Sequence, residues 1–352
     1  MSDIPENASL NQMLQWSIKH SDPEALAAAK SKNKKLEPIP PELLDAMFPD
    51  EAKKMKEAVA TASDADAELD ARELALDDLL FMVENIDAAA DLPKINGVEP
   101  LLVLMEDPST PPTLREGAGF VLSTACQHNA YTQAAVLNRR GLSRTAAVTS
   151  SALQDGSLGL ARKCVAVLSA LIEHPRGYAT VVGIPRTEEE VEAEGVQVAT
   201  KGDGTMQGTE GHLLGLIVQL LSVVPDGPRG KSLLHRSIVV AKKVLALAEE
   251  HPGGAAEKVF PFFAQADVAP PLLEVVASPD MDWSGSVSLV ESIISLLILF
   301  KQHSIVPHPA LLPAAESVRS GLSSLAQSGS LDPATFSDLY PLLTTLEQPP
   351  SA

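Results

Sequence analysis

A short signature recurs five times along this 352-residue chain, always at the end of an apolar run. It consists of an acid or an amide followed by His or Asn, and the intervals between its second residues are 43, 46, 77 and 52. When the copies are aligned on that residue, position −6 is Leu in every copy, and positions −10 and −3 are apolar. Offsets of −10, −6 and −3 lie on one stripe of a helix, so five amphipathic helices are predicted. The second residues of the five copies are Asn85, His128, His174, His251 and His303.

Shorter segments between the signatures also repeat. Residues 89–96, Gly97 and residues 98–105 form one pair of short helical patterns around a glycine, and 131–140, Gly141 and 142–153 form the next. Two short helices and one long helix within roughly 40–47 residues are typical of an armadillo repeat. The chain is therefore predicted to be all-α, an armadillo-like α-solenoid of about four repeats. Its long helices should line a concave groove.

The composition predicts three regions. Residues 1–65 should be a flexible N-terminal region with a short amphipathic helix at 10–20. The armadillo domain should cover 66–308, with a Gly-rich, charged insertion at about 183–211 that explains the long third interval. Residues 309–352 should form C-terminal capping helices, at 310–325 and 333–346, and a tail.

The chain has a net charge of −19, and from residue 61 to 107 only Arg72 and Lys94 offset the carboxylates. Such a chain repels phosphate backbones, so nucleic acid is not expected as a partner. The acidic run either forms a solvated face or steers a basic partner surface. No apolar stretch has the length of a bilayer span, and residues 1–7 do not resemble a signal peptide, so no membrane partner is expected. We expect a cytosolic monomer.

The residues contain no convincing catalytic or metal-binding constellation. Cys126 and Cys164 lie inside apolar runs and are expected to be buried thiols. The signature histidines are a repeat or more apart, which favours helix-end capping over a metal site. Gly230-Lys231-Ser232 resembles the end of a phosphate-binding loop, but Pro225 replaces the glycine that the motif requires and lacks an N–H to hold phosphate. We therefore expect a non-enzymatic protein without cofactor or metal.

Four segments resemble a known family. Residues 14–18 (LQWSI) are similar to the L-x-W-S-I opening of the cytosolic Fes-type nucleotide exchange factors, relatives of the animal heat-shock-protein-70-binding protein. Residues 82–92 resemble that family's L-V-E-D-I-D-N-A-N-D-L segment, and 114–129 and 160–175 resemble two further segments. The chain departs from the family at Glu116, where Trp is common, and in the insertion. Gly117 and Gly119 should each weaken their helix by roughly 1 kcal/mol relative to Ala.

The resemblance implies a co-chaperone. A four-repeat armadillo core would hold lobe II of the ATPase domain of a cytosolic heat-shock protein 70 and promote ADP release, while the N-terminal region aids substrate release. The residues expected on the partner-binding concave face are Glu84, Asp87, Arg115, Arg162, Lys163 and Arg236. The residues expected in the substrate-release helix are Leu14, Trp16 and Ile18. Each of the polar residues is also compatible with a plain solvent-exposed role.

Two alternatives remain at this level. A generic armadillo scaffold would bind an extended peptide, but import-type grooves use ladders of Trp and Asn, and Trp16 and Trp283 form no ladder. An enzyme that uses nucleoside triphosphates would depend on the defective motif at Gly230.

Overall fold

The computed structural model describes residues 50–182, 210–223, 227–250, 254–277, 287–327 and 333–349, and these ranges contain helices and no strand. The chain divides into two compact units, Met1–Asp50 and Glu51–Ala352, and every described helix belongs to the second. The predicted helix at 10–20, with Leu14, Trp16 and Ile18, lies outside the described residues. So does most of the predicted insertion, at 183–209.

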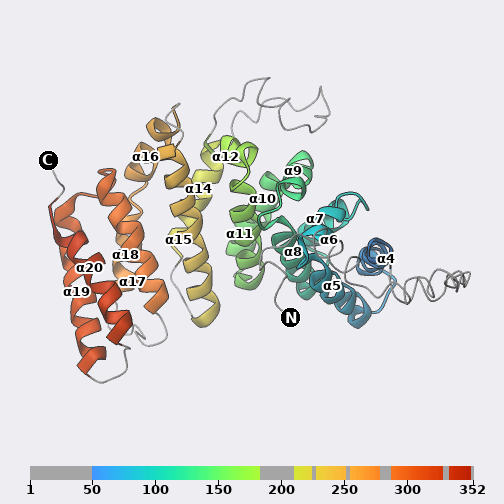
Figure 1. Cartoon of the computed structure of the whole chain (residues 1–352), viewed down its shortest axis with the longest axis horizontal. Helices are drawn as coiled ribbons and strands as arrows, with labels where there is room; N and C mark the ends of the chain where they lie inside the picture. The colour runs from blue at the N-terminus through green and yellow to red at the C-terminus, as the bar shows by residue number, and fades with distance from the viewer. Residues whose placement is uncertain are drawn as a thin grey trace, which may run out of the picture. The chain divides into compact units, whose positions relative to one another are not determined.

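The five predicted long helices are present, and they pack side by side in chain order (Figure 1). Contacts run from the first to the second, and so on to the fifth, with no helix skipped. The long helices are α5 (Leu69–Val83), α8 (Pro112–Cys126), α11 (Leu158–Ile172), α15 (Gly227–Glu250) and α18 (Val287–Gln302). Each recurrence of the signature therefore corresponds to one long helix of the stack.

Among the described residues, two shorter helices precede each of the last four long helices. They make four three-helix repeats, α6–α7–α8, α9–α10–α11, α12–α14–α15 and α16–α17–α18, as the sequence predicted. The fold is thus an all-α, armadillo-like solenoid. The shorter helices are α6 (Ile86–Asp91), α7 (Val98–Glu106), α9 (Ala130–Asn138), α10 (Gly141–Gln154), α12 (Pro175–Val182), α14 (Glu210–Leu221), α16 (Ala255–Gln265) and α17 (Ala269–Ala277).

Within the described ranges, two helices, α4 (Glu51–Ser63) and α5, precede these repeats and two follow them. Helix α4 packs on α5, so packed structure begins ahead of residue 66, where the sequence placed the start of the repeat domain. Helices α19 (His308–Gln327) and α20 (Pro333–Glu347) occupy the two predicted C-terminal segments and pack on α17 and α18 respectively. In the described ranges no single helix has the length and apolar character to cross a membrane, and only the bent pair α16–α17 passes that test.

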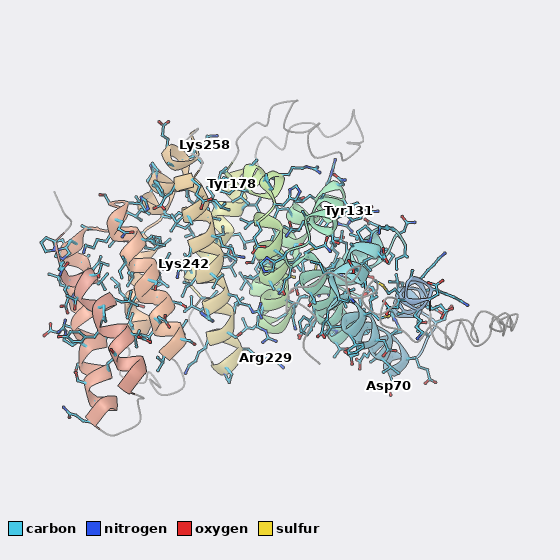
Figure 2. All side chains as sticks on the ribbon, in the orientation of Figure 1. Asp70, Tyr131, Tyr178, Arg229, Lys242 and Lys258 are labelled. Atoms are coloured by element: carbon cyan, nitrogen blue, oxygen red, sulfur yellow. The ribbon has the colours of Figure 1, made fainter. Side chains whose placement is uncertain are left out.

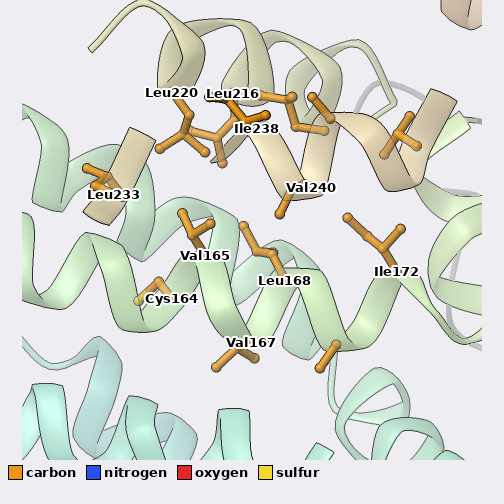
Figure 3. Close-up of a cluster of buried hydrophobic side chains, with 14 of the residues drawn as sticks. Cys164, Val165, Val167, Leu168, Ile172, Leu216, Leu220, Leu233, Ile238 and Val240 are labelled. Atoms are coloured by element: carbon orange, nitrogen blue, oxygen red, sulfur yellow. The ribbon is translucent and has the colours of Figure 1, made fainter. Parts of the chain in front are cut away.

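The aligned apolar positions form the core. Fourteen of them are buried, and Met82 is partly buried against the same cluster. Figure 3 shows how a repeat interface closes, with Val165 and Leu168 of α11 directed toward Leu216 and Leu220 of α14 and Val240 of α15. The stripe positions are Ala75, Leu79, Met82, Ala118, Leu122, Ala125, Cys164, Leu168, Leu171, Ala241, Leu245, Ala248, Ile293, Leu297 and Phe300.

The signature residues act at the junction between two repeats. Asn85 Oδ1 accepts the backbone N–H of Asp87 (2.9 Å), and His174 Nδ1 accepts that of Arg176 (3.1 Å), so each caps the helix that follows. In the second repeat this role passes to Asn129, whose Oδ1 accepts the N–H of Thr132 (3.1 Å). The prediction that the signature residues cap the helices that they end is therefore wrong for these copies, because each cap serves the start of the next helix. His251 lies outside the described residues.

Hydrogen bonds between repeats set the stacking interval. Thr132 Oγ1, fully buried, donates to the carbonyl of Ala89 (2.9 Å), and Asn129 Nδ2 donates to that of Ile86 (3.2 Å). Both pairs are separated by 43 residues, which equals the first signature interval. Equivalent short helices of successive repeats are thereby joined at one register.

Candidate partner-binding site

Three cations come together on the long helices, on the side facing away from the core stripe. Arg162 and Lys163 directly precede the fully buried Cys164 on α11, and Arg236 lies on the next long helix, α15. Arg162 and Lys163 are half-buried, whereas Arg236 is exposed. We call these three residues the cation cluster. All three were predicted as binding residues, and the structure brings them together.

The pKa values show that the cluster is electrostatically strained. The pKa of Lys163 falls to about 8, first because the ammonium is desolvated and then because Arg162 and Arg236 repel its charge. Glu116 acts in the opposite direction. The pKa of Arg236 is also lowered, by desolvation and by Arg162. An anionic group from a partner would relieve this repulsion.

The surroundings of Arg162 and Lys163 set them apart from ordinary surface cations. The Nε atom of Arg162 is buried and has no hydrogen-bond partner among the described residues. Lys163 Nζ lies 2.9 Å from the ring centroid of Phe120, which is itself 40% exposed. A cation and an exposed aromatic ring therefore share one surface, and Arg and aromatic residues dominate binding energy at protein interfaces.

Glycines bring α8 and α11 close enough to build this surface. A Cβ at Gly159 would lie 2.3 Å from Glu116 Oε1, and a Cβ at Gly119 would lie 3.2 Å from Lys163 Cβ. The glycines that the sequence marks as weakening α8 therefore include one at a crowded helix–helix contact. Glu116, at the position where the family commonly has Trp, lies against the backbone of α11.

The neighbouring lysine on α15 is already paired. Lys243 Nζ donates to Ser169 Oγ of α11 (3.0 Å) and forms an ion pair with Glu173, which directly follows α11. Its charge is compensated within the array, unlike those of the cation cluster. Sequence reasoning missed Phe120 and the 37%-exposed Val239, because an apolar residue on a helix gives no sign by itself that it faces solvent.

A cavity of about 640 Å³ opens where three long helices begin. Arg115 and Glu116 of α8, residues 156–160 around the start of α11, and Pro228 and Arg229 of α15 contribute to its wall. Arg229 lies at the first turn of α15 (Figure 2). The predicted binding residue Arg115 donates from Nε to the carbonyl of Met105 (3.0 Å), which fixes its stem against α7.

The other predicted residues lie elsewhere. Glu84 follows the last residue of α5 and Asp87 lies in the first turn of α6, and both are exposed. Their role, like that of Leu14, Trp16 and Ile18 outside the described residues, stays a prediction. Sequence position alone does not separate these acids from ordinary solvated residues.

The structure also places the phosphate-loop-like motif and the two cysteines. Gly230-Lys231-Ser232 lies inside α15, which begins at Gly227, and not in a loop that precedes a helix. Cys126 and Cys164 are buried free thiols, and desolvation raises the pKa of each to about 12. Within the described ranges, no group of three or more His, Cys, Asp and Glu side chains is arranged to hold a metal ion.

Sequence comparison connects this array to known proteins. The family described as "Nucleotide exchange factor Fes1" matches residues 10–92. The chain is 32% identical over 171 residues to the Hsp70 nucleotide exchange factor FES1 of Kluyveromyces lactis, covering 47% of this chain and 55% of the relative. It is 25% identical over 281 residues to the protein of that name from Debaryomyces hansenii, covering 79% and 89%. The Scheffersomyces stipitis protein is 29% identical, over 49% and 59%.

The chain thus spans somewhat more than half the length of two of these relatives and most of the third. The resemblance to the Fes-type exchange factors is confirmed. Among solved structures, an engineered protein matches with a TM-score of 0.52 at 12% identity, covering 83% of this chain and 96% of that protein. That match concerns the fold alone. A designed armadillo repeat protein in complex with the peptide (KR)4 matches with a TM-score of 0.49 at 11% identity, over 84% and 99%.

Proposed function

We propose that the chain is a nucleotide exchange factor of a cytosolic heat-shock protein 70. It binds the ATPase domain of that chaperone through the long helices and promotes release of ADP. The similarity to the Fes-type exchange factors supports this activity. The factor acts by binding, so no residue of this chain has to perform a chemical step.

The cation cluster is the observation that carries the proposal. The chain has a net charge of −19, yet Arg162, Lys163 and Arg236 gather on one side, and among the described residues Glu116 is the one that raises the pKa of Lys163. Folding does not favour such an arrangement, because it lowers the pKa of both Lys163 and Arg236. A cluster of like charges that costs the free protein stability, and is not neutralised by nearby opposite charges, is typical of a binding site. We therefore assign the contact with the chaperone to this cluster and Phe120.

Exchange requires only differential affinity. If the array binds the ATPase domain more tightly when its nucleotide cleft is open than when it is closed on ADP, binding shifts the population toward the open form. By linkage, the factor lowers the affinity of the ATPase domain for ADP, and ADP lowers the affinity of that domain for the factor by the same ratio. A stack of helices joined by buried hydrogen bonds suits this role, because it resists deformation toward the closed form.

Three finer points belong to the same proposal. The chaperone surface is lobe II of its ATPase domain, and it presents acidic groups to the cation cluster. Leu14, Trp16 and Ile18 form the helix that aids substrate release. The chain works as a monomer in the cytosol, without cofactor, metal, nucleic acid or membrane.

The test is stopped-flow release of a fluorescent ADP analogue from a cytosolic heat-shock protein 70, with and without the chain. The proposal expects faster release that saturates as the chain is added. It is wrong if release is not accelerated at saturating chain.

Charge reversal tests the assigned surface. Arg236→Glu removes a repelled, exposed cation, so the fold should tolerate it, but the concentration for half-maximal acceleration should rise at least about tenfold, as for a hot-spot arginine. Lys258→Glu, on the exposed side of α16, makes the same charge change away from the cluster and serves as the matched control (Figure 2). Equal losses in both variants would contradict the assignment to the cluster.

A generic scaffold that binds an extended peptide is the second candidate. The same assay separates the two, because a scaffold would bind peptides without accelerating ADP release. The exposed Phe120 and the cation cluster are compatible with either, whereas the similarity to exchange factors favours the first.

A further inference from the structure

The outer flank of α5 carries large apolar side chains that are exposed in the described part of the chain. Leu74 is 61% exposed and Phe81 is 77% exposed. They are seven residues apart, with Asp77 and Asp78 between them, so all four lie along one stripe of the helix. Asp70, four residues before Leu74, extends the stripe toward the start of α5 (Figure 2). We call these five residues the α5 flank.

Comparison with the equivalent positions of later long helices indicates what could pack on this flank. The position equivalent to Leu74 is Gly117 in α8 and Lys163 in α11. A Cβ at Gly117 would lie 2.9 Å from Leu76 Cδ1 of α5, and Lys163 Cβ lies close to Gly119 of α8. In α8 and α11 this side of the long helix thus packs against the long helix before it. Helix α5 is the first long helix of the described part, so its flank has the shape that receives a helix.

Leu74 and Phe81 are apolar, unlike the residues that usually lie on the outer face of the first helix in an array. Terminal repeats usually present a polar outer face, which keeps the array soluble. Leu74 and Phe81 depart from that rule, whereas Leu76, on the opposite side of α5, is buried against α8. An exposed apolar pair rimmed by charges is typical of an interaction site.

The charges select the partner. Asp70, Asp77 and Asp78 are all exposed, and α5 carries one base, Arg72. Arg72 Nε donates to the carbonyl of Ala62 at the end of α4 (3.0 Å), so this base is held toward α4. The flank is therefore acidic around an apolar centre. Two such flanks would repel each other, which argues against a second copy of the chain.

We propose that the α5 flank docks a basic amphipathic helix of another polypeptide. Its apolar residues, spaced by seven, would lie on Leu74 and Phe81, about 10.5 Å apart along the helix axis. Its Lys and Arg residues would meet Asp70, Asp77 and Asp78. This surface is distinct from the cation cluster, which selects an acidic partner, so the array has two binding surfaces of opposite charge.

The test uses the full-length chain and a fluorescein-labelled synthetic helical peptide with leucines at seven-residue spacing and flanking lysines. A second peptide replaces the lysines by glutamates and keeps the leucines. Fluorescence anisotropy should show binding of the basic peptide and at least tenfold weaker binding of the acidic one. Affinity for the basic peptide should fall as NaCl is raised from 50 to 300 mM, because exposed charges are screened.

Variants locate the site. Phe81→Ala and Leu74→Ala should each lower the affinity for the basic peptide about tenfold. Both side chains are exposed, so the fold is expected to tolerate their loss. Asp77→Asn with Asp78→Asn should weaken binding and flatten its salt dependence. Val103→Ala, which removes a 49%-exposed side chain from α7, is the matched apolar control and should change nothing. Acceleration of ADP release should be unaffected by Phe81→Ala, which separates this inference from the proposed function.

Several results would overturn the inference. Absence of binding by the basic peptide at 100 μM would do so, as would equal affinity for the acidic peptide. Unchanged affinity in Phe81→Ala and Leu74→Ala would place the peptide elsewhere. Sedimentation that shows a dimer lost in Phe81→Ala would assign the flank to a second copy instead.

Discussion

The lowered pKa of Lys163 makes a measurable prediction about stability. A free lysine side chain has a pKa near 10.5, and in the folded chain that of Lys163 is about 8. Below pH 8 the residue is charged in both the folded and the unfolded chain, and the folded chain bears the full cost of desolvation and repulsion. Between pH 8 and 10.5 the folded chain loses this proton while the unfolded chain keeps it. The free energy of unfolding contributed by Lys163 therefore rises with pH through that window.

The size of the effect follows from the two pKa values. One pKa unit corresponds to about 1.4 kcal/mol, so the full gap would be ~3 kcal/mol. Because the ammonium is partly exposed and water screens it, we take about half, ~1–2 kcal/mol. The assay is urea unfolding of the wild type and of Lys163→Met at pH 7 and pH 9.5. Methionine keeps the apolar stem that packs beside Phe120 and removes the charge.

The quantity to compare is the difference in unfolding free energy between the wild type and Lys163→Met at each pH. Cys126, Cys164 and Tyr178 each have a pKa raised to about 12, so the unfolded chain ionises these groups first above pH 9. Their contribution to unfolding free energy falls with pH in both proteins and cancels in the difference. Relative to Lys163→Met, the wild type should gain ~1–2 kcal/mol between pH 7 and pH 9.5.

Two further variants check the cause. Arg236→Gln removes one repelling charge, so it should raise the pKa of Lys163 and reduce the gain. Glu116→Gln removes the one attractive charge, so it should lower that pKa and increase the gain at pH 9.5. Lys258→Met controls for loss of a lysine away from the cluster. Parallel stability profiles for the wild type and Lys163→Met, within about 0.3 kcal/mol, would refute the reasoning.

Three other substitutions test the packing of the array by the same unfolding assay. Gly177→Ala should destabilise the fold by about 2–4 kcal/mol, because the added Cβ would lie 1.9 Å from a backbone carbonyl oxygen. Gly215→Ala should instead stabilise helix α14 by about 0.5–1 kcal/mol, because the space around Gly215 is open. If both changed stability equally, the described backbone geometry at these sites would be wrong. Thr132→Val should cost about 1–2 kcal/mol, because the carbonyl of Ala89 loses a buried hydrogen bond between repeats, and an unchanged midpoint would contradict this role. Arg144→Met should cost about 1 kcal/mol at low salt and less at high salt, because it breaks the ion pairs with carboxylates of α7, and a salt-independent loss would point to packing instead.

The stacked array of long helices was predictable from the periodic pattern of apolar residues. Leu79, Leu122 and their equivalents recur at one register, and a stripe of that period can be buried only against neighbouring helices. The intervals between signatures therefore predicted the number of long helices and their order. The capping residues were also readable, although Asn85 and His174 cap the next helix and not the one they end. That distinction depends on the backbone direction after the helix, which composition does not encode.

The tertiary structure decided which polar residues act together. Arg162, Lys163 and Arg236 are one site because α11 and α15 are adjacent, whereas Lys243 on the same helix is neutralised by Glu173. The exposed state of Phe81 likewise follows from its place on the first long helix, since the equivalent position in α11 is buried. A repeat assigns the same sequence positions to every copy. Only the neighbours that surround each copy decide whether a given position becomes core, ion pair or binding surface.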